Sequence, residues 1–381
     1  MKVSFIGLGK LGLPCAEVVA ERSTIEVHGY DIEKRYSDKV QIHDSLENAV
    51  LDMDIVFVAT PTPHDKDYGG EKPVSHLEPK DFNYSAVTDV LKQCDTLMND
   101  KQMLVLISTV LPGTTRKHFA DLIKNAQFVY NPYLIAMGTV KYDFLRPEMI
   151  MIGTKLGGES EPAKRLINFY QQVLGYKPRI ELGTWDECEA IKIFYNTFIS
   201  TKISLVNMIQ DVAVKNGNIN VDVVTDALCN STDRIVSPKY MRAGMGDGGA
   251  CHPRDNIALR WLSKQMDLNY DLFSAIIEAR EMQAKNMAKE ILKYGRVVHF
   301  TSDSYKPNTQ LQDGSYSLLV QHYVKELGGD ISDGFGQPVD VHVLVHPGDY
   351  VKVDGHGVIF DPWRKYPKGP NVVHYGGNNN V

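Results

Sequence analysis

The chain has 381 residues, of which 43% are hydrophobic. At roughly 100–200 residues per domain, this length predicts two or three domains with sizeable cores, and the composition excludes extended disorder. The 41 basic and 47 acidic residues give a net charge of −6 without a long basic run, so we expect no nucleic-acid partner. No long uncharged apolar stretch and no signal-peptide pattern occurs, so we expect a cytoplasmic protein without a membrane partner.

Five cysteines are scattered along the chain without CxxC spacing. They are Cys15, Cys94, Cys188, Cys229 and Cys251. An odd number at such spacings argues against a disulfide framework and against a zinc site, so we expect no bound metal. The first four are interpreted as packing residues, whereas the last lies in a glycine-rich setting described below.

The first third of the chain alternates short β-branched runs with amphipathic stretches, which is typical of βαβ units in a parallel sheet. Strands are predicted at residues 3–6, 26–30, 54–59, 104–108, 128–130 and 149–152. Helices are predicted at residues 11–21, 84–94 and 115–124. The segment 61–79 is rich in Pro, Gly, Asp and His, and we expect it to form a loop at the ligand-binding edge of the sheet.

From about residue 186 the apolar residues recur with helical spacing. Residues 186–215 contain no Pro or Gly and predict one helix of about 45 Å, which would link two domains or form a dimer seam. Further helices are predicted at residues 221–228, 253–264 and 272–293. A second α/β unit follows, with strands at 297–300 and 341–345, a helix at 316–327 and a frayed tail at 368–381.

A glycine-rich turn, GLGKLG at residues 7–12, connects the first predicted strand to the first helix. In such a turn Gly7 permits the tight bend, Gly9 lets a pyrophosphate approach the backbone, and Gly12 allows the helix to pack closely. The helix N-terminus then offers free N–H groups to the anion. Asp31, at the end of the second strand, would accept the ribose hydroxyls and repel a 2′-phosphate, so we predict NAD rather than NADP.

Two more strand ends carry hydroxyl groups, ATPTP at residues 59–63 and STVLPGT at residues 108–114. Because both follow buried strands, Thr60 and Thr109 are expected at the carboxyl edge of the sheet, beside the nicotinamide. Turn formation and helix capping are the alternative explanation for these residues.

Within the long helix, Glu189, Lys192 and Asn196 lie on one face. A lysine with a carboxamide one turn away can polarise a substrate oxygen, and burial could lower the lysine pKa into a useful range. The alternative is that these three residues only form a polar stripe that faces solvent.

The segment GMGDGGACHPRD, residues 244–255, clusters four glycines before Cys251. Pro253 can start a helix there, so the Cys251 thiolate would be favoured by free N–H groups and by Arg254. Asp255, in the first turn, is placed to hold a proton or a water. Cys251 is therefore the candidate nucleophile.

Over nearly its whole length the chain resembles the UDP-glucose/GDP-mannose dehydrogenase family of nucleotide-sugar dehydrogenases. Residues 7–12 with Asp31 match its NAD fingerprint, residues 60–63 its PTP loop and residues 108–114 its STVPPGT segment. Residues 189–207 are similar to its central helix. Arg234-Ile235 with Pro238-Lys239 resembles RIGPKF, and residues 248–255 resemble GGSCFPKD. Residues 305–309 resemble FKPNT, and Asp354-Gly355 with Asp361-Pro362 resembles DGR…DP.

The resemblance implies an α/β fold in which two Rossmann-like, doubly wound domains are joined by the long central helix and a helical middle domain. The expected division is residues 1–185 for the NAD-binding domain, 186–294 for a central dimerisation domain and 295–381 for a short C-terminal domain that binds an NDP-sugar. The implied partners are the NDP-sugar, with UDP-glucose favoured, and a second copy of the chain.

The implied reaction oxidises the C6 alcohol of an NDP-sugar to a carboxylate while two NAD⁺ are reduced. Lys192 and Asn196 would stabilise the alkoxide and the oxyanion, Cys251 would attack the aldehyde, and Asp255 with Thr109 would support hydrolysis. The implied cofactor-binding residues are Gly7, Gly9, Leu11, Gly12, Asp31, Thr60, Pro61, Thr109 and Arg254. The implied substrate-binding residues are Tyr133, Leu134, Lys192, Asn196, Arg234, Lys239, Gly248 and Lys306.

Several positions depart from the family pattern, among them Arg254 in place of a lysine and His252 in place of an aromatic residue. Tyr133 and Met137 replace both glutamates of its NPEFLREG segment, so thioester hydrolysis is expected to be slow or to depend on Asp255 alone. Asp313 stands where the family has a substrate-binding arginine. Two alternatives follow: a two-electron dehydrogenase of the 6-phosphogluconate or β-hydroxyacid type, and a catalytically weakened NDP-sugar binder.

Overall fold

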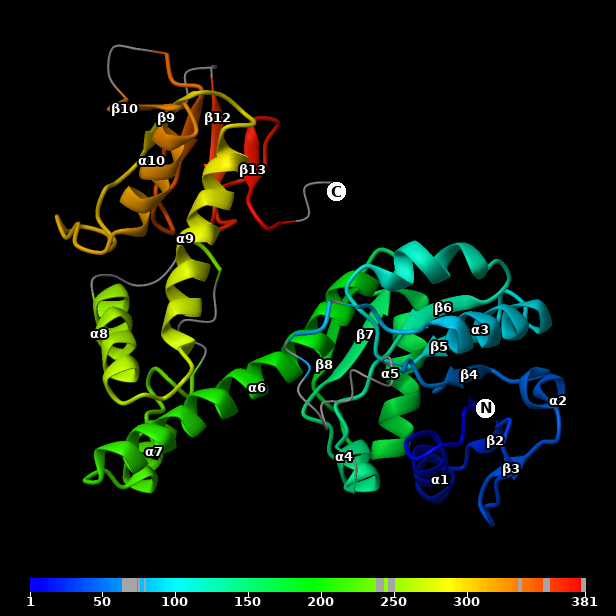
Figure 1. Cartoon of the computed structure of the whole chain (residues 1–381). Coiled ribbons are helices and arrows are strands. Elements are labelled where there is room, and N and C mark those ends of the chain that lie inside the picture. The colour runs from blue at the N-terminus through cyan, green and yellow to red at the C-terminus, as the bar shows by residue number, and fades with distance from the viewer. Residues whose placement is uncertain are drawn as a thin grey trace. The chain divides into compact units, whose positions relative to one another are not determined.

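The computed structural model describes residues 1–63, 74, 76–78, 80–136, 138–237, 243–245, 251–334, 338–351 and 357–377. The chain forms two compact units, residues 1–202 and 203–381, which are coloured from blue to green and from green to red in Figure 1. The three-part division expected from the sequence stays a prediction. Among the described residues, no helix is both long enough and apolar enough to cross a bilayer.

An eight-stranded sheet organises the first unit, in the order β3-β2-β1-β4-β5-β6-β7-β8. The strands are β1 (Lys2–Ile6), β2 (Glu26–Tyr30), β3 (Gln41–Ile42), β4 (Ile55–Val58), β5 (Met103–Leu106), β6 (Gln127–Tyr130), β7 (Ile150–Thr154) and β8 (Ile180–Thr184). All pairs are parallel except β6 with β7. The order of the first six strands is that of dinucleotide-binding sheets, so the predicted Rossmann-like domain is confirmed.

Five α-helices connect these strands before the long central helix. They are α1 (Gly12–Arg22), α2 (Leu46–Val50), α3 (Ser85–Leu97), α4 (Val140–Leu145) and α5 (Glu161–Leu174). Of these, α1 and α3 are predicted from the sequence, whereas α2, α4, α5 and the strands β3 and β8 are not. Both ends of α5 are nevertheless marked, because Ser160 accepts the N–H of Ala163 and Gly175 ends the helix at φ +72°.

The segment predicted to be helical at residues 115–124 is helical over most of its length, but it does not form an α-helix. A π-helical turn, Thr115–Phe119, and a 3₁₀ turn, Ala120–Leu122, occupy this segment. The wider turn starts where a carboxylate from the central helix holds the backbone N–H groups of Gly113 and Thr115. It also buries the Phe119 ring, edge-on against Tyr84.

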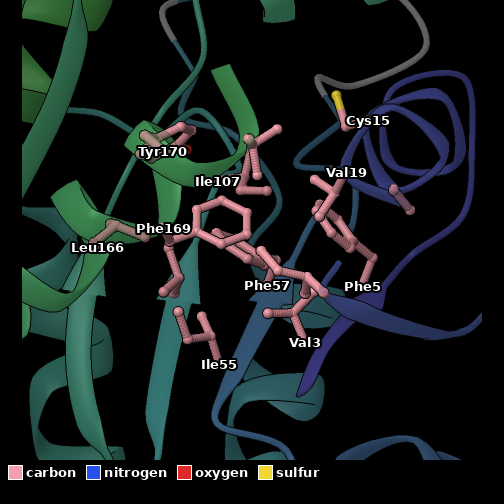
Figure 2. Packing of buried hydrophobic residues seen from close by; sticks show 14 of the residues in the cluster. Val3, Phe5, Cys15, Val19, Ile55, Phe57, Ile107, Leu166, Phe169 and Tyr170 are labelled. Carbon is pink, nitrogen blue, oxygen red and sulfur yellow. The ribbon is translucent and has the colours of Figure 1, made fainter. Parts of the chain in front are cut away.

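The core of the first unit lies on both faces of the sheet. Figure 2 shows one face, where Phe5 and Phe57 stack at 4.7 Å and Phe169 from α5 packs against Phe57. Removing one such ring typically costs about 3–5 kcal/mol. Cys15 packs in the same cluster, and Cys94 and Cys188 pack on the other face, as predicted.

Burial raises the pKa of the Cys94 thiol and of the Cys188 thiol to about 12, so both are inert packing residues. Cys229 is exposed, so the prediction that it packs in the core is wrong.

The long central helix is confirmed as α6 (Trp185–Asn216). Three helices follow it: α7 (Val221–Cys229), α8 (Cys251–Gln265) and α9 (Leu272–Ile291). They begin and end within a few residues of the predicted positions.

A second, parallel sheet has the order β10-β9-β11-β12-β13. Its strands are β9 (Val297–Phe300), β10 (Asp330–Ser332), β11 (Val341–Val343), β12 (Val358–Asp361) and β13 (Val372–His374), and α10 (Tyr316–Glu326) connects β9 to β10. Its buried side chains pack with those of α9 and α10 in one cluster. The predicted fraying of the tail is wrong at β13, which pairs with β12. Residues 378–381 lie outside the described part.

Candidate active site

The structure explains separately why each of the three motif positions between β1 and α1 is a glycine. Gly7 has φ +95°, and a Cβ there would lie 2.8 Å from the carbonyl oxygen of Ala59 at the end of β4. A Cβ on Gly12 would lie 1.9 Å from the carbonyl oxygen of Gly7, so the start of α1 needs glycine. A Cβ on Gly9 would meet nothing within 4 Å, which leaves room for a ligand against the backbone.

Asp31 links the end of β2 to this glycine-rich turn. Its Oδ2 accepts the N–H of Leu8 at 2.7 Å, and its Oδ1 accepts the N–H of Glu33 at 2.8 Å. Arg35 Nε lies 3.8 Å from Oδ2. A carboxylate has about four acceptor positions, so Asp31 can still accept ribose hydroxyls.

The two hydroxyl-bearing strand ends are bonded to each other. Ser108 Oγ donates to the carbonyl oxygen of Thr60 at 2.5 Å, and Thr62 Oγ1 donates to that of Thr109 at 2.6 Å. Thr60 Oγ1 is buried and has no hydrogen-bond partner among the described residues. An unpaired buried hydroxyl is costly, so this group is suited to bind a ligand.

These segments enclose one cleft of about 760 Å³ within the first unit. Its volume is that of a typical ligand site. The predicted residues that line it are Gly7, Gly9, Leu11, Gly12, Asp31, Thr60, Pro61, Thr109, Tyr133 and Lys192. The open backbone at Gly9 and the unpaired Thr60 hydroxyl fit a dinucleotide, whose pyrophosphate would face the glycine-rich turn.

The three polar residues on one face of α6 have different surroundings. Glu189 is fully buried and accepts the N–H groups of Gly113 at 2.5 Å and Thr115 at 2.7 Å, so it anchors the loop after β5. Burial raises the pKa of its carboxyl group. Lys192 is half-buried at the cleft wall, whereas Asn196 is exposed. The solvated polar stripe considered above therefore applies to Asn196 alone.

Lys192 is held by the backbone of the loop after β6. Its Nζ donates to the carbonyl oxygen of Tyr133 at 2.8 Å. Burial lowers the pKa of this ammonium group. The side chain thus presents a fixed donor to the cleft, close to the loop that carries Thr109.

The Tyr133 loop is itself fixed by α5. The Tyr133 and Tyr170 hydroxyls lie 3.2 Å apart, and the Tyr170 hydroxyl donates to Asn131 Oδ1. Asn131 Nδ2 donates to the carbonyl oxygen of Met151 in β7 at 2.7 Å. Burial raises the pKa of the Tyr133 phenol well above 10, so this group stays neutral at pH 7. Leu134 packs in the hydrophobic core and is absent from the described lining of the cleft.

Apart from Met137, the remaining predicted residues belong to the second unit. Arg234, Lys306 and Asp313 are exposed there. Cys251 is the first residue of α8, which also contains Arg254 and Asp255, and the description of these three is limited to the backbone. Met137, Lys239 and Gly248 lie outside the described residues.

Sequence reasoning missed several residues near the site, Glu33 among them. Lys10 and Arg35 line the cleft. The sequence could have indicated both, because Lys10 lies inside the glycine motif and Arg35 lies four residues after Asp31. Tyr170 has no such signal, because only the packing of α5 brings it to Tyr133.

Comparison with known proteins gives two family matches. Residues 33–174 match the NAD-binding domain of the UDP-glucose/GDP-mannose dehydrogenase family, and residues 186–281 match its central domain. The UDP-glucose 6-dehydrogenase YwqF of Bacillus subtilis is 25% identical over 74% of this chain and 62% of its own length. The UDP-glucose 6-dehydrogenase of Campylobacter jejuni is 23% identical over 98% of this chain and 89% of its own length.

The chain spans less than two thirds of several relatives, and only 30% of the uncharacterized protein MJ1054 of Methanocaldococcus jannaschii, to which it is 27% identical. Among solved structures, a ternary complex of GDP-mannose dehydrogenase from Pseudomonas aeruginosa aligns with a TM-score of 0.82. That alignment covers 99% of this chain and 100% of the other at 19% identity, which shows a shared fold.

Proposed function

Because the chain belongs to the UDP-glucose/GDP-mannose dehydrogenase family of NAD-dependent nucleotide-sugar dehydrogenases, we propose that it oxidises the C6 alcohol of an NDP-sugar to a carboxylate. UDP-glucose is the first candidate substrate, since several relatives are named for it. One alcohol, one water and two NAD⁺ would give one carboxylate, two NADH and three protons. NAD⁺, when bound, accepts the two hydrides.

The proposal is carried by the position of Lys192. Its ammonium group, fixed by the Tyr133 carbonyl, lines the same cleft as the glycine-rich turn and Thr109. A preorganised cationic donor is the group needed where an alkoxide or a tetrahedral oxyanion develops negative charge. Asn196, about one helical turn further along α6, would supply a second donor.

Cys251 would act as the nucleophile in the second oxidation. Its sulfur bonds to the aldehyde carbon to form a thiohemiacetal, which loses a hydride and a proton to become a thioester. Because Cys251 begins α8, the helix N-terminus would favour the thiolate. Water then cleaves the C–S bond and releases the carboxylate, and we assign the support of this hydrolysis to Asp255 and Thr109.

We infer that Arg234, Lys239 and Lys306 meet the diphosphate or the sugar, with Gly248 allowing close approach of the backbone. Arg254 would contact the cofactor, and Leu134 would contact the substrate through its backbone. We infer a homodimer from the large apolar side chains that helices α6, α7 and α8 expose.

Tyr133 favours one second candidate, a weakened NDP-sugar binder. A carboxylate at this position could accept a proton from water, but a buried phenol whose pKa lies well above 10 cannot act as a base at pH 7. The thioester would then accumulate, and the chain would keep the sugar nucleotide bound without further turnover.

NADH yield per sugar separates these possibilities. We expect two NADH and a uronic acid, identified by mass, from one member of a panel of UDP- and GDP-sugars. Cys251→Ser should stall at the aldehyde stage with at least about 100-fold lower turnover, and Cys229→Ser, at an exposed cysteine, is the control. One NADH per sugar would indicate the two-electron dehydrogenase, and tight binding with no NADH beyond a single burst of two per active site would indicate the binder. Full activity of Cys251→Ala would contradict the mechanism.

A further inference from the structure

Glu33 and Arg35 form an ion pair at the rim of the cleft, shortly after Asp31 in the chain. Arg35 Nη2 donates to Glu33 Oε2 at 2.5 Å, and Arg35 Nε lies 3.8 Å from Asp31 Oδ2. All three side chains line the cleft. One guanidinium is therefore shared by two carboxylates, beside the place expected for the adenosine ribose.

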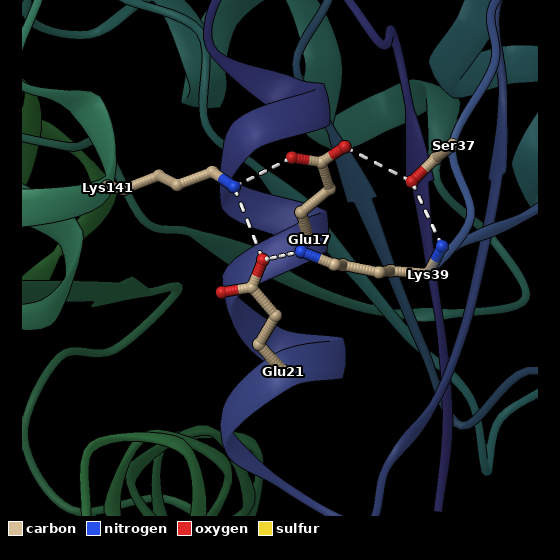
Figure 3. A network of polar contacts seen from close by, with 5 residues as sticks. All are labelled: Glu17, Glu21, Ser37, Lys39 and Lys141. Atoms are coloured by element: carbon tan, nitrogen blue, oxygen red, sulfur yellow. Dashed lines mark hydrogen bonds and ion pairs between the residues drawn. The ribbon is translucent and has the colours of Figure 1, made fainter.

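The segment that carries this ion pair is anchored just beyond it (Figure 3). Ser37 Oγ donates to Glu17 Oε1 of α1 at 3.1 Å, and the Lys39 ammonium binds Glu21. Lys141 of α4 lies 2.8 Å from Glu17 Oε2 and 3.3 Å from Glu21 Oε1. Single exposed ion pairs contribute little, but four linked contacts between three segments keep the loop in one place.

A guanidinium at this corner is the group that binds the 2′-phosphate in NADP-dependent enzymes of this fold. Arg35 Nε is buried 3.8 Å from Asp31 Oδ2 and has no hydrogen-bond partner among the described residues, so the protein does not use all donors of this guanidinium. Asp31, Glu33 and Arg35, however, together carry a net charge of −1. A 2′-phosphate placed here would meet like charge.

We propose that Glu33 is a selectivity residue: it engages Arg35 and, with Asp31, keeps a latent 2′-phosphate site closed to NADP. Without Glu33, the guanidinium would face the 2′-position with Asp31 as its only carboxylate neighbour among the described residues. The inference rests on the dinucleotide site of the proposed function and is independent of the sugar.

Calorimetric titration with NAD⁺ and NADP⁺ tests this without any sugar, because the two probes differ only in the 2′-phosphate. At low ionic strength Glu33→Gln should bind NADP⁺ about three- to tenfold more tightly than wild type, with NAD⁺ affinity changed less than about twofold. The gain should vanish in the double variant Glu33→Gln/Arg35→Ala. Glu159→Gln removes the same charge at an exposed position outside the described lining of the cleft and serves as the control.

Equal NADP⁺ affinity of wild type and Glu33→Gln would overturn the proposal. So would a gain that survives the loss of Arg35 or that Glu159→Gln reproduces. If wild type binds neither probe, the dinucleotide site itself is wrong. If NAD⁺ binds but no sugar is oxidised, only the proposed reaction fails, and the titration still decides the role of Glu33.

Discussion

At the scale of single residues, the surroundings of Lys192 set a limit on the pH at which the proposed chemistry can work. The ammonium group must keep its proton to stabilise an oxyanion. Because burial lowers the pKa of Lys192, the proton is lost at a lower pH than from a free lysine, whose pKa is about 10.4. The alkaline limb of kcat/KM should therefore lie below that value.

Lys192→Arg should move this limb to higher pH, because a guanidinium stays charged throughout. Its changed shape should also lower kcat by about tenfold or more. Profiles of kcat/KM between pH 7 and 11 for wild type and variant measure both effects. Lys155→Arg, at an exposed loop position, controls for charge-conserving substitution as such. An alkaline limb that stays in place in Lys192→Arg would contradict the assignment.

At the scale of elements, the Glu189 carboxylate connects α6 to the loop after β5 through two backbone N–H groups. Glu189→Gln leaves one of these buried donors poorly paired, so we expect a loss of about 1–3 kcal/mol in the free energy of unfolding. Urea denaturation measures this loss, with Glu159→Gln, at an exposed position outside α6, as the control. Equal stability of wild type and Glu189→Gln would show that the connection is dispensable.

The sign of the pH dependence follows from the direction of the pKa shift. Because burial raises the pKa of Glu189, the folded chain binds this proton more readily than the unfolded chain. Its contribution to stability therefore falls as pH rises from the ordinary value near 4.3 through the raised one. Glutamine does not titrate, so Glu189→Gln should cost more stability at pH 4.5 than at pH 7. The opposite order would contradict the shift.

The sequence predicts those elements whose patterns are local. Buried β-branched runs give the strands around β1 and β4, and helical spacing gives α6. The turn Thr115–Phe119 depends instead on Glu189, which no nearby residue reveals. Likewise β13 lies in a Gly- and Asn-rich tail and becomes a strand through pairing with β12.

The residues of the candidate site also differ in whether a local sequence pattern predicts them. Gly7 and Asp31 are found by motif, since a phosphate-binding turn needs them at fixed spacing. The sequence indicates the Glu33–Arg35 ion pair only weakly, through its closeness to Asp31 in the chain. The contact between Tyr170 and Tyr133 cannot be predicted without the packed fold. Motifs therefore predict groups that meet the cofactor, whereas the groups that position them come from tertiary packing.

At the scale of the whole molecule, the helices after the first sheet expose large apolar side chains. The exposed fraction is 64% for Phe194 and 50% for Phe198 on α6, 66% for Val223 on α7 and 63% for Trp261 on α8. Large exposed apolar side chains of this kind are typical of a surface that a partner covers. In the homodimer proposed above, a second copy of the chain would cover them.

Trp261→Glu should weaken this dimer, because a buried tryptophan at an interface centre is often worth about 2 kcal/mol or more, roughly a 30-fold change in Kd. Light scattering after size exclusion should give twice the chain mass of 42.7 kDa for wild type and a larger monomer fraction for the variant. Leu156→Glu, at an 89% exposed loop position in the first unit, should stay dimeric. A monomeric wild type at tens of micromolar, or a folded Trp261→Glu as dimeric as wild type, would contradict the interface.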